Sequence, residues 1–264
     1  MAAAAFYRGS FAEFLSYNLP VMTDTEERLW SRRAFVKTAL AGAAAGLIVP
    51  IDQAANPVPS ALDHIILGID DLDRGIGWME EHAGVRPVFG GVHPGRGTRN
   101  ALLSLGPRRY LEIMAPDPRQ TSQNWHEEVR TLREPRLVGW AAHTEDIAAL
   151  ARKAVAAGFA IEGPKDGSRT RPDGKTLRWK SFSLKDDRGG LLPFFIEWSS
   201  ESVHPASDAP SGCTLAHFFL QSPTWQELAK ACQSLGLDIA VERDERSQLR
   251  ARIATPKGDV ELTS

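Results

Sequence analysis

One order of predicted elements, strand–helix–strand–strand–strand, occurs three times between residues 62 and 264. Each helix starts at a residue suited to capping, and the three caps, Asp71, Asp146 and Thr224, lie about 75 residues apart. A near-fixed period of this kind indicates repeated structural units. Most of the strands are joined as hairpins and each unit has one helix, which favours α+β layers over a doubly wound parallel sheet. The sequence therefore predicts an α+β fold of three βαβββ modules.

The bounds of the predicted elements follow from apolar and β-branched runs separated by glycine and proline turns. Helices are predicted over 71–84, 146–158 and 224–236, each ending at a glycine. Strands are predicted over 62–69, 86–91, 100–105, 110–115, 137–146, 160–163, 177–184, 191–198, 214–221, 238–244, 249–256 and 259–264. A segment over 201–212 that is rich in proline, serine and aspartate divides the first two units from the third.

The first part of the chain has a different pattern. Residues 31–37 read Ser-Arg-Arg-Ala-Phe-Val-Lys and precede an uncharged stretch over 38–51. That stretch is too short to span a bilayer core of about 30 Å as a helix, but it has the length of a signal-peptide apolar region. Ala54 and Ala55 supply small residues for cleavage. The order strongly resembles the twin-arginine export signal of bacteria. The alternative is an ordinary buried helix that begins with two arginines.

Residues 1–55 are therefore predicted to be a twin-arginine-type signal segment, and the protein is predicted to be exported to the bacterial periplasm. The part before Ser31 is long for such a signal, whereas a start at Met22 gives a compact one. We interpret residues 1–21 as an extension upstream of the true start. This export route carries folded proteins, so the resemblance also raises the expectation of a bound metal or cofactor.

The charge balance excludes one class of partner. The chain has 31 lysine and arginine residues against 33 aspartate and glutamate residues, which gives a formal net charge of -2. Without a basic excess, binding to the phosphates of nucleic acid is not expected. No stable membrane span is expected either. The predicted partner is a small-molecule substrate, and a homodimer is a second expectation.

The repeated unit resembles the βαβββ module of the vicinal oxygen chelate superfamily, which comprises glyoxalase, bleomycin-resistance and dioxygenase proteins. The run LDHIILGIDDLD over 62–73 resembles the first strand and helix start of that superfamily. The run over 90–118, the run LPFFIEW over 192–198 and the pair at 204–205 resemble the glyoxalase-like domain in particular.

The resemblance implies a domain organisation and a range of chemistries. Paired modules over 61–200 would form the glyoxalase-like domain, and a third module would occupy 213–264. The superfamily includes isomerases, dioxygenases, thiol transferases and non-catalytic binding proteins, so the fold does not fix the reaction.

In metal-dependent members of this superfamily, each module supplies one ligand from its first strand and one from its last. The resemblance therefore implies that His64, Glu112 and Glu197 bind a divalent metal, with Glu112 and Glu197 also as catalytic residues. Alignment of the helix caps puts Gly139 where the second module would carry a histidine, and His143 comes four residues later. The four-ligand site of glyoxalase I is thus incomplete.

These residue types point to a particular chemistry. Neutral imidazole together with carboxylate suits zinc, nickel, iron or manganese, and an open position lets two neighbouring substrate oxygens bind. The metal would stabilise an enediolate as a base removes the adjacent proton. Two histidines and one carboxylate would instead indicate ferrous oxygen chemistry. The alternative for Glu112 and Glu197 is an ion pair with Arg109, Arg178 or Lys180.

The third unit contains two pairs of chemically active residues. His217 and Glu261 occupy the ligand positions of a module, but they are the weaker metal candidates because an unpartnered module can have this face covered. Cys213 opens the first strand of the unit, and Cys232 lies near the end of its helix. An oxidising compartment would permit a disulfide between them, whereas two separate buried thiols are the other interpretation.

The loop over 90–100 combines four glycines with several hydrogen-bond donors. Glycine permits close backbone approach, and His93, Arg96, Thr98 and Asn100 offer side chains suited to a carboxylate or phosphate oxygen. We predict that these four residues bind the substrate. The alternative is a wide hairpin whose polar groups cap one another.

The sequence therefore predicts an exported glyoxalase-like protein that acts on a small molecule with two vicinal oxygens. A metal-dependent lyase or isomerase, or a related dioxygenase-like enzyme, is the first hypothesis. The second is a non-catalytic protein on the same scaffold that binds or sequesters a small molecule. Arg171, in the long connection of the second unit, either lines the same pocket or belongs to a solvated loop.

Overall fold

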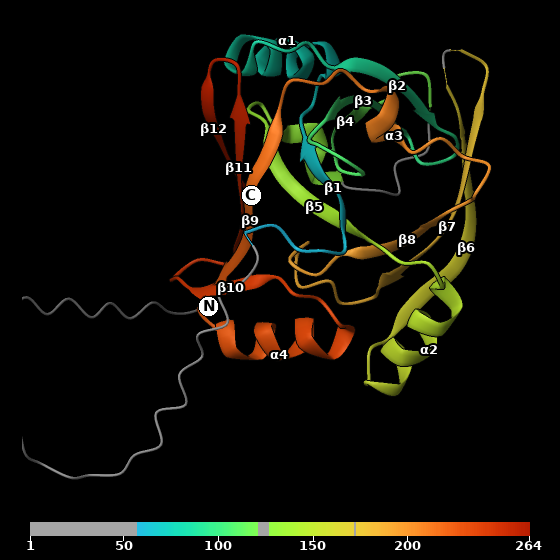
Figure 1. Cartoon of the computed structure of the whole chain (residues 1–264), viewed down its shortest axis with the longest axis vertical. Helices are drawn as coiled ribbons and strands as arrows, with labels where there is room; N and C mark the ends of the chain where they lie inside the picture. Colours follow the sequence, from blue (N-terminus) through green and yellow to red (C-terminus); the bar gives the residue numbers. More distant parts are fainter. Residues whose placement is uncertain (1–56, 121–126, 172) are drawn as a thin grey trace, which may run out of the picture. The chain divides into compact units, whose positions relative to one another are not determined.

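The computed structural model describes residues 57–120, 127–171 and 173–264 (Figure 1). The signal segment predicted over 1–55 lies outside the described residues. Within the described ranges, no helix is long and apolar enough to cross a bilayer.

The elements follow the repeated order along the chain. The first unit consists of β1 (Leu62–Gly68), α1 (Leu72–Ala83), β2 (Val88–His93), β3 (Thr98–Ser104) and β4 (Tyr110–Pro116). A 3-10 helix, η1 (Glu127–Thr131), precedes the second unit, which consists of β5 (Arg136–His143), α2 (Ile147–Ala156), β6 (Ile161–Thr170), β7 (Thr176–Leu184) and β8 (Phe194–Trp198). A short helix, α3 (Pro205–Asp208), precedes the third unit, which consists of β9 (Thr214–Ser222), α4 (Trp225–Leu235), β10 (Ala240–Arg243), β11 (Gln248–Thr255) and β12 (Gly258–Thr263).

The helix starts confirm two of the three predicted caps in full. Asp71 Oδ1 accepts a hydrogen bond from the backbone N–H of Arg74 at 2.9 Å, and Asp146 Oδ1 accepts one from Ala149 at 2.8 Å. Thr224 also precedes its helix, but its side chain makes no cap bond. Glycines in the left-handed conformation follow α1 and α4, as the pattern predicts.

Strand β6 is longer than the sequence pattern indicates. The pattern predicts a strand over 160–163 followed by a loop, because glycine and proline residues there resemble turn residues. In the structure a bulge after Glu162 takes up Gly163 and Pro164, and the strand then continues to the end of Ile161–Thr170 in register with β7.

The first two units share one eight-stranded sheet with the order β2-β3-β4-β1-β5-β8-β7-β6. In each unit the first strand lies parallel to the last, and the hairpin strands follow antiparallel. Strands β1 and β5 are antiparallel and join the two units (Figure 1). The sheet curls until its edge strands β2 and β6 approach each other, since a Cβ atom on Gly91 would lie 3.1 Å from the carbonyl oxygen of Thr170. Both units therefore enclose the concave face.

The third unit keeps the element order but not the strand pairing of the first two. Its sheet has the order β10-β9-β11-β12, so that β9 lies beside β10 and β11 rather than beside the last strand. The third unit is therefore not a third copy of the module. The order of elements along a chain is compatible with several pairings, and here the strand after the helix returns parallel to β9.

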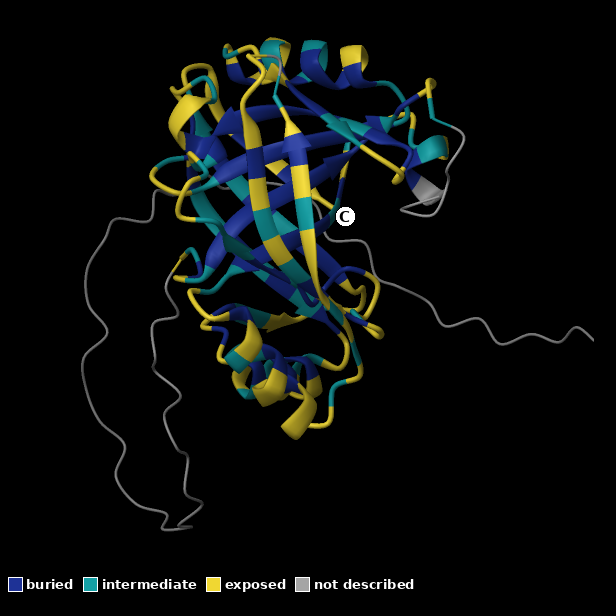
Figure 2. Ribbon diagram, turned by 90° about the vertical axis from the view of Figure 1, so that its right-hand side faces the viewer, coloured by how far each residue is buried: buried dark blue, intermediate teal, exposed yellow. Residues whose placement is uncertain are grey.

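The main hydrophobic core lies on the convex side of the eight-stranded sheet. Ile65 and Leu67 of β1 are fully buried there with Met79 of α1. Trp140 of β5 packs on Phe218 of β9 with ring centroids 5.3 Å apart, which connects the third unit to this core. Figure 2 shows that burial is concentrated in the strands, whereas the outer faces of the helices are exposed.

Cys213 and Cys232 are both buried in the main core, and both are free thiols. The structure thus agrees with two separate thiols rather than a disulfide. Burial raises the pKa of Cys232 to about 12, so this thiol stays protonated at neutral pH.

Candidate functional site

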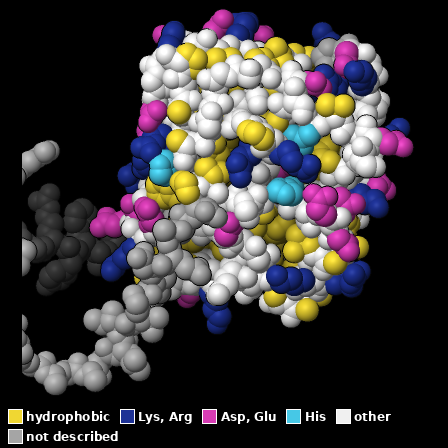
Figure 3. Space-filling view, viewed as in Figure 1, with side chains coloured by type: hydrophobic (Ala, Val, Ile, Leu, Met, Phe, Trp, Pro, Cys, Tyr) yellow, Lys and Arg dark blue, Asp and Glu magenta, His cyan; other side chains and the backbone are white. Residues whose placement is uncertain are grey.

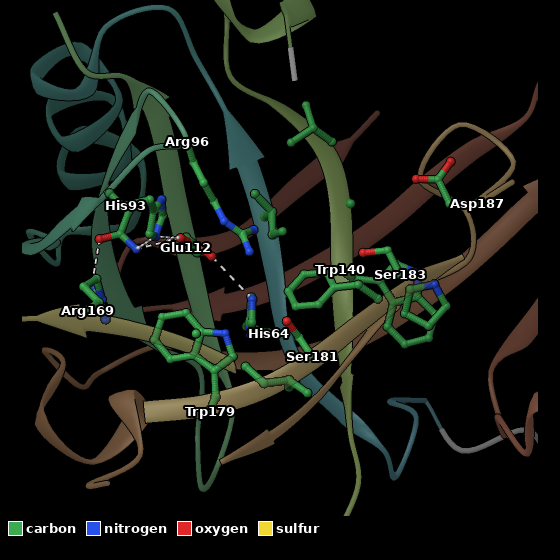
Figure 4. A pocket seen from close by; sticks show the side chains of 18 of the residues that line it. His64, His93, Arg96, Glu112, Trp140, Arg169, Trp179, Ser181, Ser183 and Asp187 are labelled. Carbon is green, nitrogen blue, oxygen red and sulfur yellow. Dashed lines mark hydrogen bonds and ion pairs between the residues drawn. The ribbon is translucent and has the colours of Figure 1, made fainter. Parts of the chain in front are cut away.

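A cavity of about 490 Å³ opens on the concave side of the eight-stranded sheet. Side chains from both units line the cavity. They include His64, His93, Asn100 and Glu112 of the first unit and Arg169, Trp179, Phe194 and Trp198 of the second. Histidine and basic side chains gather near the middle of the face drawn in Figure 3, with acidic side chains beside them. Figure 4 shows the polar cluster at one side of the cavity.

A β-bulge in β1 determines how Asp63 and His64 meet. The register between β1 and β5 shifts here: Leu62 lies opposite Ala142 and His64 lies opposite Ala141, which leaves Asp63 as the extra residue. In a regular strand the two side chains would point to opposite faces. The bulge changes their directions, and His64 Nδ1 lies 2.6 Å from Asp63 Oδ1.

His64 lies at the floor of the cavity between two carboxylates. Its Nδ1 contacts Asp63, and its Nε2 lies 3.4 Å from Glu112 Oε2. The ring stacks on Tyr110 with centroids 4.4 Å apart and meets Phe194 edge-on at 5.5 Å. Burial by itself lowers the pKa of His64, but hydrogen bonds and charges from the two carboxylates outweigh burial and raise the pKa to about 9. His64 is therefore a cation at neutral pH.

Glu112 faces three polar side chains. Its Oε1 accepts a hydrogen bond from Asn100 Nδ2 at 2.6 Å and lies 3.4 Å from His93 Nε2, while Oε2 faces His64. Burial opposes ionisation, but the hydrogen bonds and positive charge around Glu112 hold its pKa well below the usual range. His64 and Glu112 lie close together, as the sequence predicts, because β1 and β4 are parallel neighbours. Ile66 of β1 lies opposite Glu112.

His93 is neutral, in contrast to His64. Its Nδ1 lies 2.8 Å from Thr98 Oγ1, and its Nε2 lies 3.3 Å from Asn100 Nδ2, which is a donor. The same Nε2 faces Glu112 Oε1 at 3.4 Å, so His93 lies between a hydroxyl group, an amide NH₂ and a carboxylate. Burial lowers the pKa of His93 to about 4. The Glu112 charge opposes this shift, and the nearby Arg169 guanidinium adds to it.

The four predicted loop residues lie in or beside the cavity. His93 and Asn100 line it within the polar cluster, and Arg96 lines it from an exposed position. Thr98 is buried and contacts His93 rather than the cavity itself. The segment is also a β2–β3 hairpin in which some polar groups bond one another, as His93 and Thr98 do. The predicted cavity lining and the alternative of a self-capping hairpin therefore each describe part of this segment.

Arg169 is a cavity residue that sequence reasoning missed. It is 4% exposed, and its Nη1 donates to Asn100 Oδ1 at 2.7 Å, which turns the amide NH₂ toward Glu112. The sequence instead singles out Arg171, which pairs with Asp208 and does not line the main cavity. The alternation of side chains between the two faces of β6 could have identified Arg169. The glycine and proline residues of that strand resemble a turn instead, so the sequence pattern does not predict a strand that reaches Arg169.

Glu197 does not join His64 and Glu112. Its neighbour Trp198 lines the cavity, and side chains alternate along β8, so Glu197 points away from the cavity. Its Oε2 accepts a hydrogen bond from the backbone N–H of Ile147 at 2.6 Å, at the start of α2. This carboxylate thus interacts favourably with the positive end of a helix.

Strand register identifies the second-unit counterparts of His64 and Glu112. In the first unit, Ile66, which is two positions after His64, lies opposite Glu112. In the second unit, Ala141, which is two positions after Gly139, lies opposite Phe194. The counterpart of Glu112 is therefore Phe194 rather than Glu197, and both ligand positions of the second unit lack a donor side chain.

The residues do not fit the metal centre that the resemblance implies. A zinc, nickel, iron or manganese centre of that kind needs at least three protein donors around one point. Across the ranges that the structure describes, no three His, Cys, Asp or Glu side chains form such a group. His217 and Glu261 are also separated, because Arg252 of the intervening β11 lies opposite both. Of the predicted ligands, only His64 and Glu112 meet.

Residues 62–236 match the model of a family described as a glyoxalase-like domain. The chain belongs to the glyoxalase-like domain family. This match confirms the family that the sequence motifs resemble, and it extends through α4 of the third unit. No curated protein matches the chain.

Solved structures are similar to this glyoxalase-like protein at low sequence identity. A hypothetical protein from Staphylococcus aureus is 19% identical, with a TM-score of 0.55 over 76% of this chain and 84% of that chain, and it shows the shared fold. Methylmalonyl-CoA epimerase from Mycobacterium tuberculosis is 21% identical, with a TM-score of 0.38 over 53% of this chain and 87% of that chain. A variant of the Streptomyces coelicolor methylmalonyl-CoA epimerase in complex with 2-nitronate-propionyl-CoA is 19% identical, with a TM-score of 0.40 over 55% and 99%.

Proposed function

We propose that this glyoxalase-like domain is an isomerase or lyase that moves a proton at a carbon atom next to a carbonyl group. The observation that carries the proposal is the buried His64–Glu112 pair at the floor of the cavity. Burial of two ionised groups costs free energy, and strongly perturbed groups in a cavity are concentrated at functional sites. The substrate is a small molecule with vicinal oxygens, one of them a carbonyl oxygen.

Each polar side chain has a role that its surroundings support. Glu112 is ionised and faces the cavity, so it accepts the proton that leaves carbon. His64 supplies positive charge for the oxygen that becomes an enolate. Arg169 and Arg96 attract a carboxylate on the substrate, and Trp179 offers an aromatic wall for its body.

Proton transfer is coupled to ligand binding. In the ligand-free protein, hydrogen bonds from His64 and Asn100 overcome burial and hold the pKa of Glu112 low, which makes it a weak base. A ligand oxygen that takes over either hydrogen bond removes this stabilisation, and the ligand also excludes water. Both changes raise the pKa of a carboxylate toward neutrality.

The low pKa of Glu112 also supports a second candidate, a protein that binds or sequesters a small molecule without chemistry. In that case the charged cluster orients the oxygens of the ligand, and Trp179 and Trp198 hold its body. The two candidates differ in one measurable property, the exchange of a ligand C–H proton with solvent.

The divalent metal of the sequence-based hypothesis has two of its three predicted ligands at the cavity floor, His64 and Glu112. Elemental analysis of protein expressed with added zinc, nickel, iron and manganese tests this version. A stoichiometric metal that is lost in His64→Gln would support metal dependence and would contradict the proton-only account.

Proton exchange in deuterium oxide tests the proposed reaction. The α-keto acids α-ketobutyrate and phenylpyruvate carry a carbonyl beside a carboxylate and an exchangeable C–H bond, and proton NMR follows the loss of that signal. We expect the protein to accelerate the exchange of at least one of them over buffer. General base catalysis typically contributes about 100-fold or more, so Glu112→Gln should lose about that factor.

Glu197→Gln is the matched control, because it makes the same chemical change at the other carboxylate that the sequence predicts to be catalytic. Loss of its charge at the start of α2 should cost about 0.5–1 kcal/mol of stability and leave the exchange rate unchanged. Exchange that survives in Glu112→Gln and disappears in Glu197→Gln would contradict the assignment. Tight binding of both acids without exchange would favour the second candidate.

We propose separately that the protein is exported to the periplasm by the twin-arginine route. The motif over 31–37 and the uncharged stretch after it support this proposal. Replacement of the two arginines by lysine, followed by cell fractionation, tests this proposal.

A further inference from the structure

Asp63 is a buried carboxylate that the proposed reaction does not use. It is 1% exposed and does not line the cavity. Burial opposes its ionisation, but hydrogen bonds from His204 and His64 hold its pKa well below the usual range. A buried charge is tolerated only where several donors compensate for the lost water.

Three side-chain donors surround Asp63. Its Oδ1 accepts from His64 Nδ1 at 2.6 Å, and its Oδ2 accepts from Trp198 Nε1 at 2.9 Å and from His204 Nε2 at 3.1 Å. The proton on His204 Nε2 follows from the other side of that ring, where Nδ1 accepts from the backbone N–H of Ala206 at 3.2 Å. The carboxylate is thus held in one orientation.

The donors come from segments that are far apart in the sequence. Asp63 belongs to β1 of the first unit, Trp198 ends β8 of the second unit, and His204 caps the short helix α3 beyond it. The His204 ring also meets Tyr110 and Trp198 edge-on, with centroids 5.6 Å apart in both cases. The end of the second unit therefore packs around the residue that contacts His64.

We propose that Asp63 is a positioning residue: its contacts with Trp198 and His204 fix the ring of His64 with Nδ1 on Asp63 and Nε2 toward Glu112. A histidine ring has two distinct nitrogens, and the hydrogen bond at one nitrogen decides what the other presents. A ring turned away from Asp63 would no longer direct Nε2 at Glu112. The positioning is a property of the ligand-free protein, and only its catalytic consequence rests on the proposed function.

Nitrogen and proton NMR of the histidine rings in the full-length protein tests the positioning. In wild type we expect a far-downfield Nδ1 proton on His64, because the bond to Asp63 is short and charge-assisted. The signal is assigned by its absence in His64→Gln. Asp63→Asn should abolish it, whereas Trp198→Phe and His204→Gln, which each remove one donor from Oδ2, should shift it partway. An unchanged signal in Asp63→Asn would overturn the proposal.

The deuterium exchange of α-ketobutyrate and phenylpyruvate separates the positioning from the reaction. We expect Asp63→Asn to lower kcat by at least about tenfold while KM stays nearly constant, because Asp63 has no contact with the cavity. A wild-type kcat in Asp63→Asn would overturn the catalytic consequence of the positioning. A changed His64 signal without exchange in any protein, wild type included, would refute the proposed function and leave the positioning intact.

Circular dichroism shows whether the variants fold. If Asp63→Asn does not fold, Trp198→Phe and His204→Gln decide the question by the same His64 signal. A partial shift in both supports the positioning, and unchanged spectra in both overturn it.

Discussion

The buried His64 cation makes the stability of this protein depend on pH in a defined direction. Its pKa rises from 6.5 to about 9 in the folded protein, because Asp63 and Glu112 outweigh the effect of burial. A group with a raised folded pKa contributes stability that is fully present below its unfolded pKa and is lost as pH rises through its folded pKa. His64 should therefore stabilise the protein fully below about pH 6.5 and progressively less up to about pH 9.

The magnitude follows from the same interval. At about 1.4 kcal/mol for each pH unit, the interval between 6.5 and about 9 corresponds to about 3 kcal/mol of unfolding free energy. His64 is 2% exposed, so screening by solvent removes little of this contribution.

Urea unfolding of wild type and His64→Gln at about pH 6, 7.5 and 9 measures this contribution. The variant leaves two buried carboxylates without their partner, so it should be less stable throughout. The informative quantity is the gap in unfolding free energy between the two proteins, because groups that titrate alike in both proteins cancel. We expect the gap to shrink by about 3 kcal/mol between pH 6 and pH 9. A constant gap would refute the reasoning that His64 is a buried cation.

Three further predictions concern other parts of the chain. Burial raises the pKa of Cys232 to about 12, so its thiol should resist Ellman's reagent at about pH 8 until urea unfolds the protein, and rapid labelling of native protein would contradict its burial. Arg169→Met should weaken the binding of α-ketobutyrate by about tenfold or more in calorimetry, whereas Arg171→Met, outside the main cavity, should leave it unchanged; equal losses would contradict the assignment. Replacement of Arg32 and Arg33 by lysine should hold the protein in the bacterial cytoplasm in fractionation, and continued export would contradict the twin-arginine route.

The part of the site that the sequence predicts correctly lies within one module. His64 and Glu112 meet because the first and last strands of a βαβββ module are parallel neighbours, a relation that the element order and the family resemblance already imply. The helix starts at Asp71 and Asp146 were predictable for a similar reason, since a capping side chain bonds to the backbone only three residues away.

The errors arise where register or pairing decides the outcome. Glu197 lies in a strand that the sequence identifies, but side-chain alternation puts it on the face opposite the cavity. The bulge that joins Asp63 to His64 leaves no mark in composition or periodicity. Arg169 lies beyond glycine and proline residues that are typical of a turn, although the strand continues through them.

The third unit shows that the order of elements along the chain does not determine which strands pair. Its elements follow the order of a βαβββ module, yet β9 pairs with β10 and β11. Long-range pairing depends on which edges are available in the folded sheet, and that information is spread over the whole chain. His217 and Glu261 occupy the ligand positions of the module pattern, where they are the weaker metal candidates, and the intervening β11 separates them.

The central claim is that the His64–Glu112 pair moves a proton on a bound carbonyl compound. The most direct measurement is the rate at which wild-type protein exchanges the C–H protons of α-ketobutyrate and phenylpyruvate in deuterium oxide, beside calorimetric binding of the same acids. We expect exchange above the buffer rate for an acid that binds, and a rate about 100-fold lower in Glu112→Gln. Binding of both acids with exchange at the buffer rate would contradict it.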